Sequence, residues 1–190
     1  ADYDIVRKMR ASILILGPLL SKFGYAKISL PGGCAIGTRP IDIHLEGLIK
    51  LGTKFDIQDG FVVGSLKTFL IGNHIRLPFP SVGATENILM AAVLAKGQTI
   101  IENAAKEPEI QDLAKMLNSM GARIKGAGTE RISVVGVENL RGSSHCVIPD
   151  RIEAGTFLIA AAITRSPLII GPVIPNHLSA VISKLQECGC

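Results

Sequence analysis

Residues 88–95 read ILMAAVLA, eight apolar residues in a row and about two helical turns in length. Residues 157–163 (FLIAAAI) form a second run of the same kind. A helix that is apolar around its whole circumference has no face suited to water, so we expect both runs to be buried on every side. Doubly wound α/β proteins have the reverse arrangement, with apolar strands inside and amphipathic helices outside.

The strand-like segments, in contrast, have the pattern of half-exposed strands. In residues 53–58 (TKFDIQ), Phe55 and Ile57 fall on one face and polar residues fall on the other. Buried helices and half-exposed strands together predict an inside-out α/β fold, with sheets wrapped around central helices. The alternative is a plain α/β sandwich with one buried helix.

Glycines that follow helical runs reveal an internal repeat. One series of such helix ends is Gly52, Gly121 and Gly189, spaced by 69 and 68 residues. A second series is Gly24, Gly97 and residues 165–166, spaced by 73 and 69 residues. Glycine just past a helix is typical of a left-handed C-cap, and two series with nearly the same period indicate repeated units.

Each unit is predicted to run helix, strand, helix, strand, strand. In the middle copy these elements are residues 84–95, 98–103, 108–120, 122–125 and 131–137. The third copy reaches only its second helix before Cys190, so we expect the chain to be part of a longer protein.

Composition excludes several classes of function. The net charge is +4, aromatic residues make up 4% and there is no Trp, so the concentrated charge and stacking rings of a nucleic-acid binder are missing. The apolar stretch 11–20 is half of the roughly 20 residues that a membrane span needs, and Gly17 and Pro18 interrupt it. We expect neither a nucleic-acid nor a membrane partner.

The four cysteines are too few for a disulfide scaffold and lack the spacing of a zinc site. They are Cys34, Cys146, Cys188 and Cys190. Reduced thiols in a cytoplasmic protein are the expectation.

The glycine-rich segment 30–44 (LPGGCAIGTRPIDIH) is the first candidate site. A loop of this kind that opens into a helix offers backbone N–H groups to an anion, and Arg39 adds a guanidinium suited to phosphate. Cys34 lies in the middle of the loop, where exposure and a nearby helix start favour a reactive thiol. A lone cysteine is more often a small buried apolar residue, so both interpretations stay open at this point.

Other polar positions have simpler explanations. Ser81 or Thr85 could cap the helix that follows segment 79–86, and Gly83 would let a ligand approach the backbone there. Segment 149–156 repeats this junction one unit later. Glu107 and Glu109 suit a helix start, and Arg10 fits a solvated basic face.

The segment GGCAIGTRPIDIH (32–44), with SVGATENI (81–88) and EPEIQDLAKML (107–117), closely resembles the UDP-N-acetylglucosamine 1-carboxyvinyltransferases, a family of enolpyruvyl transferases. The likeness extends from MRASILILGPLL (9–20) to PDRIEAGTFLIAAAI (149–163). The sister family, the shikimate-pathway enolpyruvyl transferases, shares the fold but lacks this cysteine loop.

The resemblance implies an inside-out α/β barrel built from βαβαββ-type units. It implies a cytoplasmic enzyme that transfers enolpyruvate from phosphoenolpyruvate to the 3-hydroxyl of UDP-N-acetylglucosamine and releases phosphate, without a metal or organic cofactor. This is the first committed step of peptidoglycan synthesis, which links it to cell wall biogenesis, cell shape, the cell cycle and cell division. The target of fosfomycin belongs to this family.

The resemblance also assigns roles to single residues. Cys34 matches the proton donor to the methylene carbon of phosphoenolpyruvate, which also forms a covalent adduct with that substrate, and Arg39 matches an arginine that meets phosphate. Arg10 matches another arginine of the substrate site. The remaining matches line the UDP-sugar site and are Arg39, Pro40, Ile41, Asp42, Ile43, Ser81, Val82 and Gly83. Phe79 and Pro80 stand where some members carry a lysine.

By the same resemblance, residues 1–148 are two repeat units of the domain that carries the cysteine loop, and residues 149–190 begin a second domain. Other substrate-binding and basic groups of the family lie outside this stretch. We therefore expect the 190 residues alone to be catalytically incompetent. A non-catalytic repeat scaffold that binds nucleotide or protein is the alternative of a different class.

Overall fold

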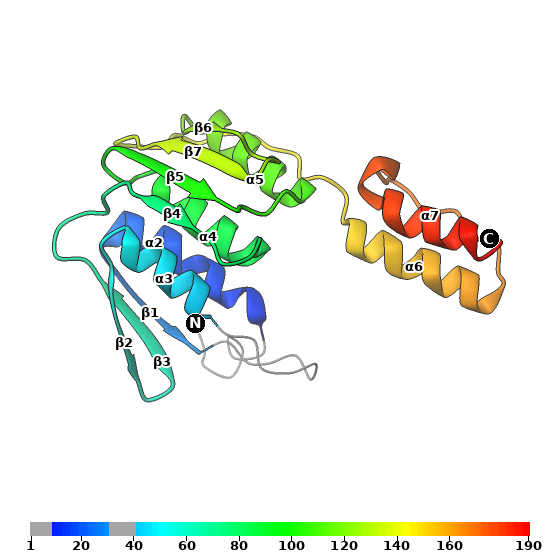
Figure 1. The fold of residues 1–190 in the computed structure, drawn as a ribbon, viewed down its shortest axis with the longest axis horizontal. Helices are drawn as coiled ribbons and strands as arrows, with labels where there is room; N and C mark the ends of the chain where they lie inside the picture. The colour runs from blue at the N-terminus through cyan, green and yellow to red at the C-terminus, as the bar shows by residue number, and fades with distance from the viewer. Residues whose placement is uncertain (1–8, 31–40) are drawn as a thin grey trace. The chain divides into compact units, whose positions relative to one another are not determined.

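The computed structural model describes residues 9–30 and 41–190 (Figure 1). The chain divides into two compact units, Ala1–Ser144 and His145–Cys190, and each is described by itself.

The first unit contains two series of elements. The first series is η1 (Arg10–Ile15), α2 (Leu16–Phe23), β1 (Tyr25–Ser29), α3 (Asp42–Lys50), β2 (Lys54–Gln58) and β3 (Phe61–Ser65). The second is β4 (His74–Arg76), α4 (Val82–Ala92), β5 (Gln98–Glu102), α5 (Pro108–Ser119), β6 (Arg123–Lys125) and β7 (Arg131–Val135). Apart from η1 and β4, both series run helix, strand, helix, strand, strand, as the repeat predicts.

The two sheets have the same internal topology. In the first, β3 lies between β1 and β2 and pairs antiparallel with both. In the second, β7 lies between β5 and β6 and again pairs antiparallel with both. The difference is β4, which adds a parallel strand on the outer side of β5. The repeat in sequence is therefore a repeat in strand order.

Helices α2, α3 and α4 lie between the two sheets (Figure 1). The middle one, α4, packs against α2, α3, η1, α5 and β7. Its residues Ile88, Leu89, Ala91 and Ala92 are completely buried, which confirms the burial predicted for this run. Full burial of an aliphatic side chain such as Ile88 stabilises a fold by about 1.5–3 kcal/mol, so this helix dominates the core.

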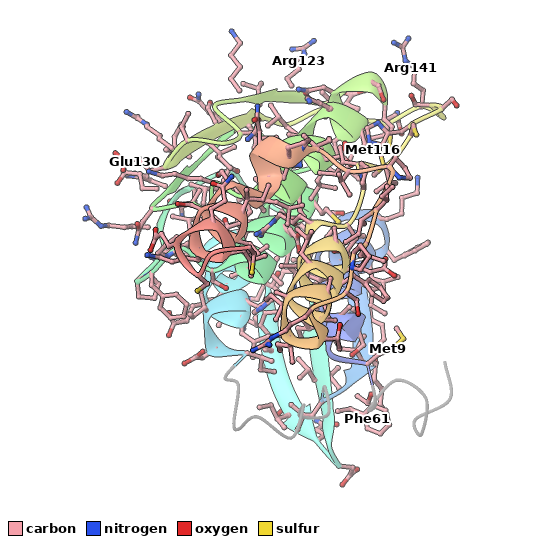
Figure 2. All side chains as sticks on the ribbon, turned by 90° about the vertical axis from the view of Figure 1, so that its right-hand side faces the viewer. Met9, Phe61, Met116, Arg123, Glu130 and Arg141 are labelled. Carbon is pink, nitrogen blue, oxygen red and sulfur yellow. The ribbon has the colours of Figure 1, made fainter. Side chains whose placement is uncertain are left out.

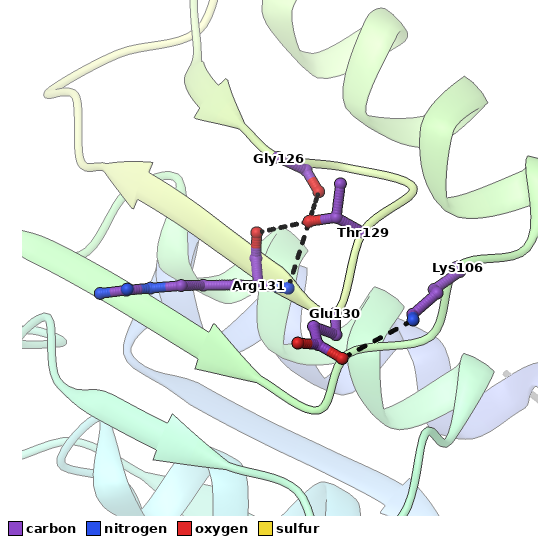
Figure 3. A network of polar contacts seen from close by, with 5 residues as sticks. All are labelled: Lys106, Gly126, Thr129, Glu130 and Arg131. Atoms are coloured by element: carbon purple, nitrogen blue, oxygen red, sulfur yellow. Dashed lines mark hydrogen bonds and ion pairs between the residues drawn. The ribbon is translucent and has the colours of Figure 1, made fainter.

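The sheets carry their charged residues on the outside. Arg123 on β6 and Arg141 beyond β7 extend outward at one end of the unit, and Phe61 at the start of β3 lies at the other (Figure 2). In the β6–β7 turn, the Thr129 hydroxyl lies 2.8 Å from the Gly126 carbonyl oxygen and 3.0 Å from that of Arg131 (Figure 3). The neighbouring Glu130 forms an exposed ion pair with Lys106 at 3.7 Å.

The predicted glycine caps are confirmed. Gly24 ends α2 in the left-handed conformation, with φ 71°, and its amide donates to Leu20 O. The other four predicted glycines, Gly52, Gly97, Gly121 and Gly189, also have φ between 87° and 107°. In the third copy Arg165 takes the left-handed position at φ 50°.

The second unit consists of helices α6 (Arg151–Thr164), η2 (Pro175–Leu178) and α7 (Ser179–Glu187). The prediction that residues 157–163 are buried on every side is wrong here, because Phe157 is 52% and Ile163 78% exposed. Within this unit only η2 and α7 pack on α6, and two short helices cannot surround a third. Ala154 and Gly155 are the residues of α6 that become buried.

Residues 165–174 also differ from the repeat, because no strand follows α6 in the way that β5 follows α4. An extended segment needs a partner for its backbone N–H and C=O groups, and residues 145–190 offer no second extended segment. Among all residues that the structure describes, no helix is both long and apolar enough to cross a membrane.

Candidate functional site

The predicted site residues fall into three groups. Cys34, Arg39 and Pro40 lie outside the described residues. Arg10 is the first residue of η1. The others lie at the starts of two helices: Ile41, Asp42 and Ile43 at α3, and Ser81, Val82 and Gly83 at α4.

Helix α4 begins with a capped but open first turn. Ser81 is the N-cap, and its hydroxyl accepts a hydrogen bond from the Ala84 amide at 3.4 Å. Thr85, the other capping candidate, is fully buried; it donates to Ser81 O at 2.7 Å and accepts from the Ala105 amide at 3.1 Å. First-turn amides have no acceptor within their own helix. Those of Val82 and Gly83 can therefore serve an acceptor from outside it.

Helix α3 begins at Asp42, with Ile41 as its N-cap. The Asp42 carboxylate is exposed and accepts from the Ile43 amide at 2.9 Å, whereas the Ile43 side chain is buried. A carboxylate in the first turn complements the positive end of the helix dipole. The exposed part of this helix start is thus polar, and its apolar part anchors it to the core.

The first turns of α3 and α4 meet η1 at one end of the helix layer. A methyl group built on Gly83 would lie 3.1 Å from Cε1 of His44 in α3 and 3.7 Å from Leu14 in η1. One turn further along, α3 meets α4 again at Gly47 and Ile88, and α2, which follows η1 directly, meets α4 at Gly17 and Asn87. The helices therefore run in the same direction, and their positive ends gather on one side of the unit. Such a place is suited to a phosphate or diphosphate group.

A buried polar side chain that the sequence did not reveal connects these helices. Asn87 on α4 is completely buried, and its Oδ1 accepts from the Gly17 amide at 2.7 Å. Its Nδ2 donates to Ile13 O at 3.0 Å and lies 3.2 Å from Nδ1 of His44. The sequence does hold one indication that Asn87 is buried, because this residue directly precedes the apolar run 88–95 on the same helix.

Acidic residues border the same end of α4. Burial raises the pKa of the Glu86 carboxyl above its ordinary value of 4.5, and the charges of Glu109 and Glu107 raise that pKa further. Glu109 lies in the first turn of α5, where Pro108 is the first residue as predicted. Among the described residues, no group of three or more His, Cys, Asp or Glu side chains is arranged to hold a metal ion.

A groove of about 690 Å³ opens at the C-terminal ends of α2, α4 and α5. Met90, Leu94, Met116 and Met120 supply much of its lining. Of the predicted site residues that the structure describes, none lines this groove, so its volume says nothing about the candidate site.

Comparison with known proteins gives the relationships of the chain. The sequence model of the EPSP synthase (3-phosphoshikimate 1-carboxyvinyltransferase) family matches residues 1–190. Among curated proteins, the UDP-N-acetylglucosamine 1-carboxyvinyltransferase of Prochlorococcus marinus (strain NATL2A) is 65% identical over 191 residues, which is 99% of this chain and 42% of that protein. The UDP-N-acetylglucosamine 1-carboxyvinyltransferase 1 of Caldanaerobacter subterraneus is 60% identical over 189 residues, 100% of this chain and 45% of that protein. The chain thus spans less than half the length of these relatives.

Solved structures share the fold. The enolpyruvyl transferase NikO from Streptomyces tendae superposes with a TM-score of 0.70 at 24% identity, over 84% of this chain and 38% of that one. An EPSP synthase from Acinetobacter baumannii gives a TM-score of 0.61 at 26% identity, over 81% and 35% of the two chains. These likenesses confirm the enolpyruvyl transferase-like α/β fold that the resemblance implied. With a family match along its whole length, the chain belongs to the EPSP synthase (3-phosphoshikimate 1-carboxyvinyltransferase) family.

Proposed function

We propose that this chain is part of an enzyme that transfers enolpyruvate from phosphoenolpyruvate to the 3-hydroxyl of UDP-N-acetylglucosamine and releases phosphate. The observation that carries the proposal is the 60–65% identity, along nearly the whole chain, to relatives named for that reaction. The loop GGCAIGTRP at residues 32–40 is the most specific stretch of sequence behind it.

The reaction is an addition followed by an elimination. The 3-hydroxyl oxygen bonds to C2 of phosphoenolpyruvate while C3 gains a proton, and the hydroxyl proton passes to a base that this stretch does not supply. The tetrahedral ketal then loses phosphate from C2 and a proton from C3, which leaves the enol ether. We assign the proton delivered to C3 to the Cys34 thiol, because a thiol is ordinarily protonated at neutral pH and can still lose its proton there.

Cys34 has a second assignment in the same reaction. Its thiolate can bond to C2 of phosphoenolpyruvate once C3 is protonated, which gives the covalent adduct. Arg39, five residues further on, is assigned to the phosphate that leaves, since a guanidinium pairs with phosphate oxygens through two parallel hydrogen bonds.

The helix starts support a site for the UDP-sugar. The diphosphate is the most highly charged part of that substrate, and the amides of Val82 and Gly83 are donors at the positive end of α4. Arg10, Pro40, Ile41, Asp42 and Ile43 are assigned to the same substrate. Phe79 and Pro80 precede the Ser81 cap without adding a charge, so the backbone donors are the more important ones here.

The biological setting follows from the reaction and is part of the proposal. Enolpyruvyl transfer to UDP-N-acetylglucosamine leads to peptidoglycan, so we place the enzyme in the cytoplasm, where nucleotide sugars are made. Its loss would affect the cell wall and with it cell shape and division. We propose no metal, organic cofactor, nucleic acid or membrane as a partner.

The test uses a full-length chimera. Residues 1–190 replace the matching segment of the Caldanaerobacter subterraneus relative, and phosphate release is measured with UDP-N-acetylglucosamine or 3-phosphoshikimate as the acceptor. We expect turnover with the UDP-sugar only. Turnover with 3-phosphoshikimate alone would assign the chain to the shikimate reaction instead, and an inactive chimera beside an active relative would favour a non-catalytic scaffold.

Substitutions of Cys34 in this chimera test its role. Cys34→Ala should lower kcat by about 10²–10⁴-fold, the usual contribution of general acid catalysis, with UDP-sugar binding retained. Cys34→Asp should keep activity, because a carboxylic acid with a raised pKa can deliver the proton. It should also resist fosfomycin, because by the resemblance Cys34 matches the thiol that fosfomycin alkylates. A Cys34→Ala enzyme within a few-fold of the parent would contradict the assignment.

A further inference from the structure

We propose that Asn87 is a positioning residue for nucleotide-sugar binding. Through a buried network with Ile13, Gly17 and His44, it fixes η1 and the first turns of α2 and α3 relative to the first turn of α4. The inference rests on the function proposed above. It assigns a role to a side chain that is itself shielded from any substrate, since Asn87 is completely buried.

The partners of Asn87 define the orientation of its amide group. The Gly17 amide can only donate, so the atom 2.7 Å away must be the Asn87 oxygen. The Ile13 carbonyl can only accept, so the atom 3.0 Å away must be the Asn87 nitrogen. The second N–H of that nitrogen then points to His44 Nδ1, at 3.2 Å.

His44 is consequently in one tautomer. Because Nδ1 accepts from Asn87, the ring is neutral and carries its proton on Nε2. His44 is 6% exposed, so water offers this nitrogen little replacement for the amide. The two N–H groups of Asn87 therefore donate to Ile13 O and His44 Nδ1, and its oxygen accepts from the Gly17 amide.

Two of these partners, Ile13 and His44, lie one turn or less from a predicted substrate residue. Ile13 follows Arg10 by one turn of η1, and His44 directly follows Ile43 in α3. Asn87 itself follows Gly83 by one turn of α4. Three segments that are far apart in sequence thus have their substrate residues tied to a single side-chain amide.

The fit around the network leaves little room for rearrangement. The imidazole of His44 lies where a Cβ on Gly83 would be only 3.1 Å from Cε1. Likewise, a Cβ on Gly17 would lie 2.6 Å from Asn87 Oδ1. The contact at Gly17 is too close for any side chain, whereas a methyl group at Gly83 would require the His44 ring to shift by a few tenths of an ångström.

The first experiment measures the network in solution on the 190-residue chain. Asn87→Leu removes both the acceptor of Gly17 and the donor to His44 at similar side-chain size. We expect amide hydrogen exchange of Gly17 to accelerate at least about tenfold. The control Ile132→Ala changes a fully buried side chain of β7, and it should change the exchange rate of the Gly17 amide no more than those of neighbouring amides. Equal acceleration of Gly17 in both variants would overturn the network.

The second experiment measures UDP-N-acetylglucosamine binding by the full-length chimera described above. We expect Asn87→Leu and His44→Leu to raise KM and Kd for the UDP-sugar by about 10- to 100-fold, while kcat at saturation changes less. His44→Asn, which restores an acceptor at the place of Nδ1, should recover most of the affinity. The control Ile132→Ala should leave KM unchanged in the folded fraction.

The outcomes separate the two proposals. An active chimera whose KM is unaffected by Asn87→Leu, or is affected equally by Ile132→Ala, overturns the positioning role and leaves the proposed function standing. A chimera that has no transfer activity before any substitution overturns the proposed function, and the positioning role with it, whatever the exchange rates show.

Discussion

Gly17→Ala tests how tightly α2 and α4 are packed. Gly17 is a buried residue of α2, and its amide donates to Asn87 Oδ1 at 2.7 Å. A methyl group at this position would lie 2.6 Å from that same oxygen and closer still to the backbone carbonyl of Asn87. The backbone carbonyl cannot rotate away as a side chain could, so the two helices must separate.

Three opposing contributions set the size of the effect. Alanine instead of glycine in a helix interior stabilises by about 1 kcal/mol. Overpacking a close helix contact costs about 1–3 kcal/mol. A buried hydrogen bond that is stretched or lost costs a further 1–3 kcal/mol, roughly. The net expectation is a loss of about 1–5 kcal/mol of unfolding free energy, where each kcal/mol lowers Tm by about 2–4 °C in a chain of this size.

The assay is urea denaturation followed by far-UV circular dichroism, with Gly155→Ala as the matched control. Gly155 is also a buried helical glycine, in α6, but a methyl group there would meet Leu178 at 3.4 Å, an ordinary contact. The control should therefore gain about 0.5–1 kcal/mol. A Gly17→Ala chain as stable as the unsubstituted one would refute the close packing on which the Asn87 network depends.

Three more predictions concern single groups. Burial raises the folded-state pKa of Glu86 above 4.5, so the stability contribution of its protonated carboxyl is present below pH 4.5 and is lost as the pH rises through the folded-state pKa. Glu86→Gln should therefore raise Tm at pH 7 and change it little at pH 4. An equal gain in Tm at both pH values would count against the burial of the carboxyl. Ser81→Ala should cost about 1 kcal/mol in urea denaturation, and Ser81→Gly only a few tenths, roughly, if the capping hydrogen bond is what stabilises α4. Asp150→Ala should cost more than Ser81→Ala, up to about 2 kcal/mol, because the Asp150 carboxylate accepts from two amides, at 2.7 and 3.0 Å; a smaller loss, read from the helical signal of α6, would contradict this order.

Local patterns predicted the elements because local chemistry decides them. Gly24 and Gly121 end helices since only glycine adopts positive φ without strain, and that preference is visible in the sequence. Pro108 begins α5 because the first helical residue needs no amide donor. The burial of α4 was predictable because a run without a polar face favours packing against other elements on every side.

What the sequence missed depends on partners far along the chain. Strand β4 has three residues, and only its parallel pairing with β5 makes it a strand. Helix α6 has the same apolar pattern as α4, but a pattern does not specify what covers a helix, and within residues 145–190 little does. Asn87 is an unremarkable residue by composition, and its role follows from contacts with Gly17 and His44, 70 and 43 residues away.

The helix starts differ in how their first-turn amides are satisfied. Helix α2 has no capping side chain of its own, and the Gly17 amide in its first turn is satisfied by Asn87 from the neighbouring helix. Helix α3 uses the carboxylate of Asp42 within its own first turn. Helix α4 has only the hydroxyl of Ser81, which serves one amide at 3.4 Å. The first turn of α4 contains no acidic residue, whereas that of α3 contains Asp42, which would repel an anion. An anion at this end of the helix layer is therefore better accommodated by the amides of Val82 and Gly83, beside the helices that Asn87 contacts.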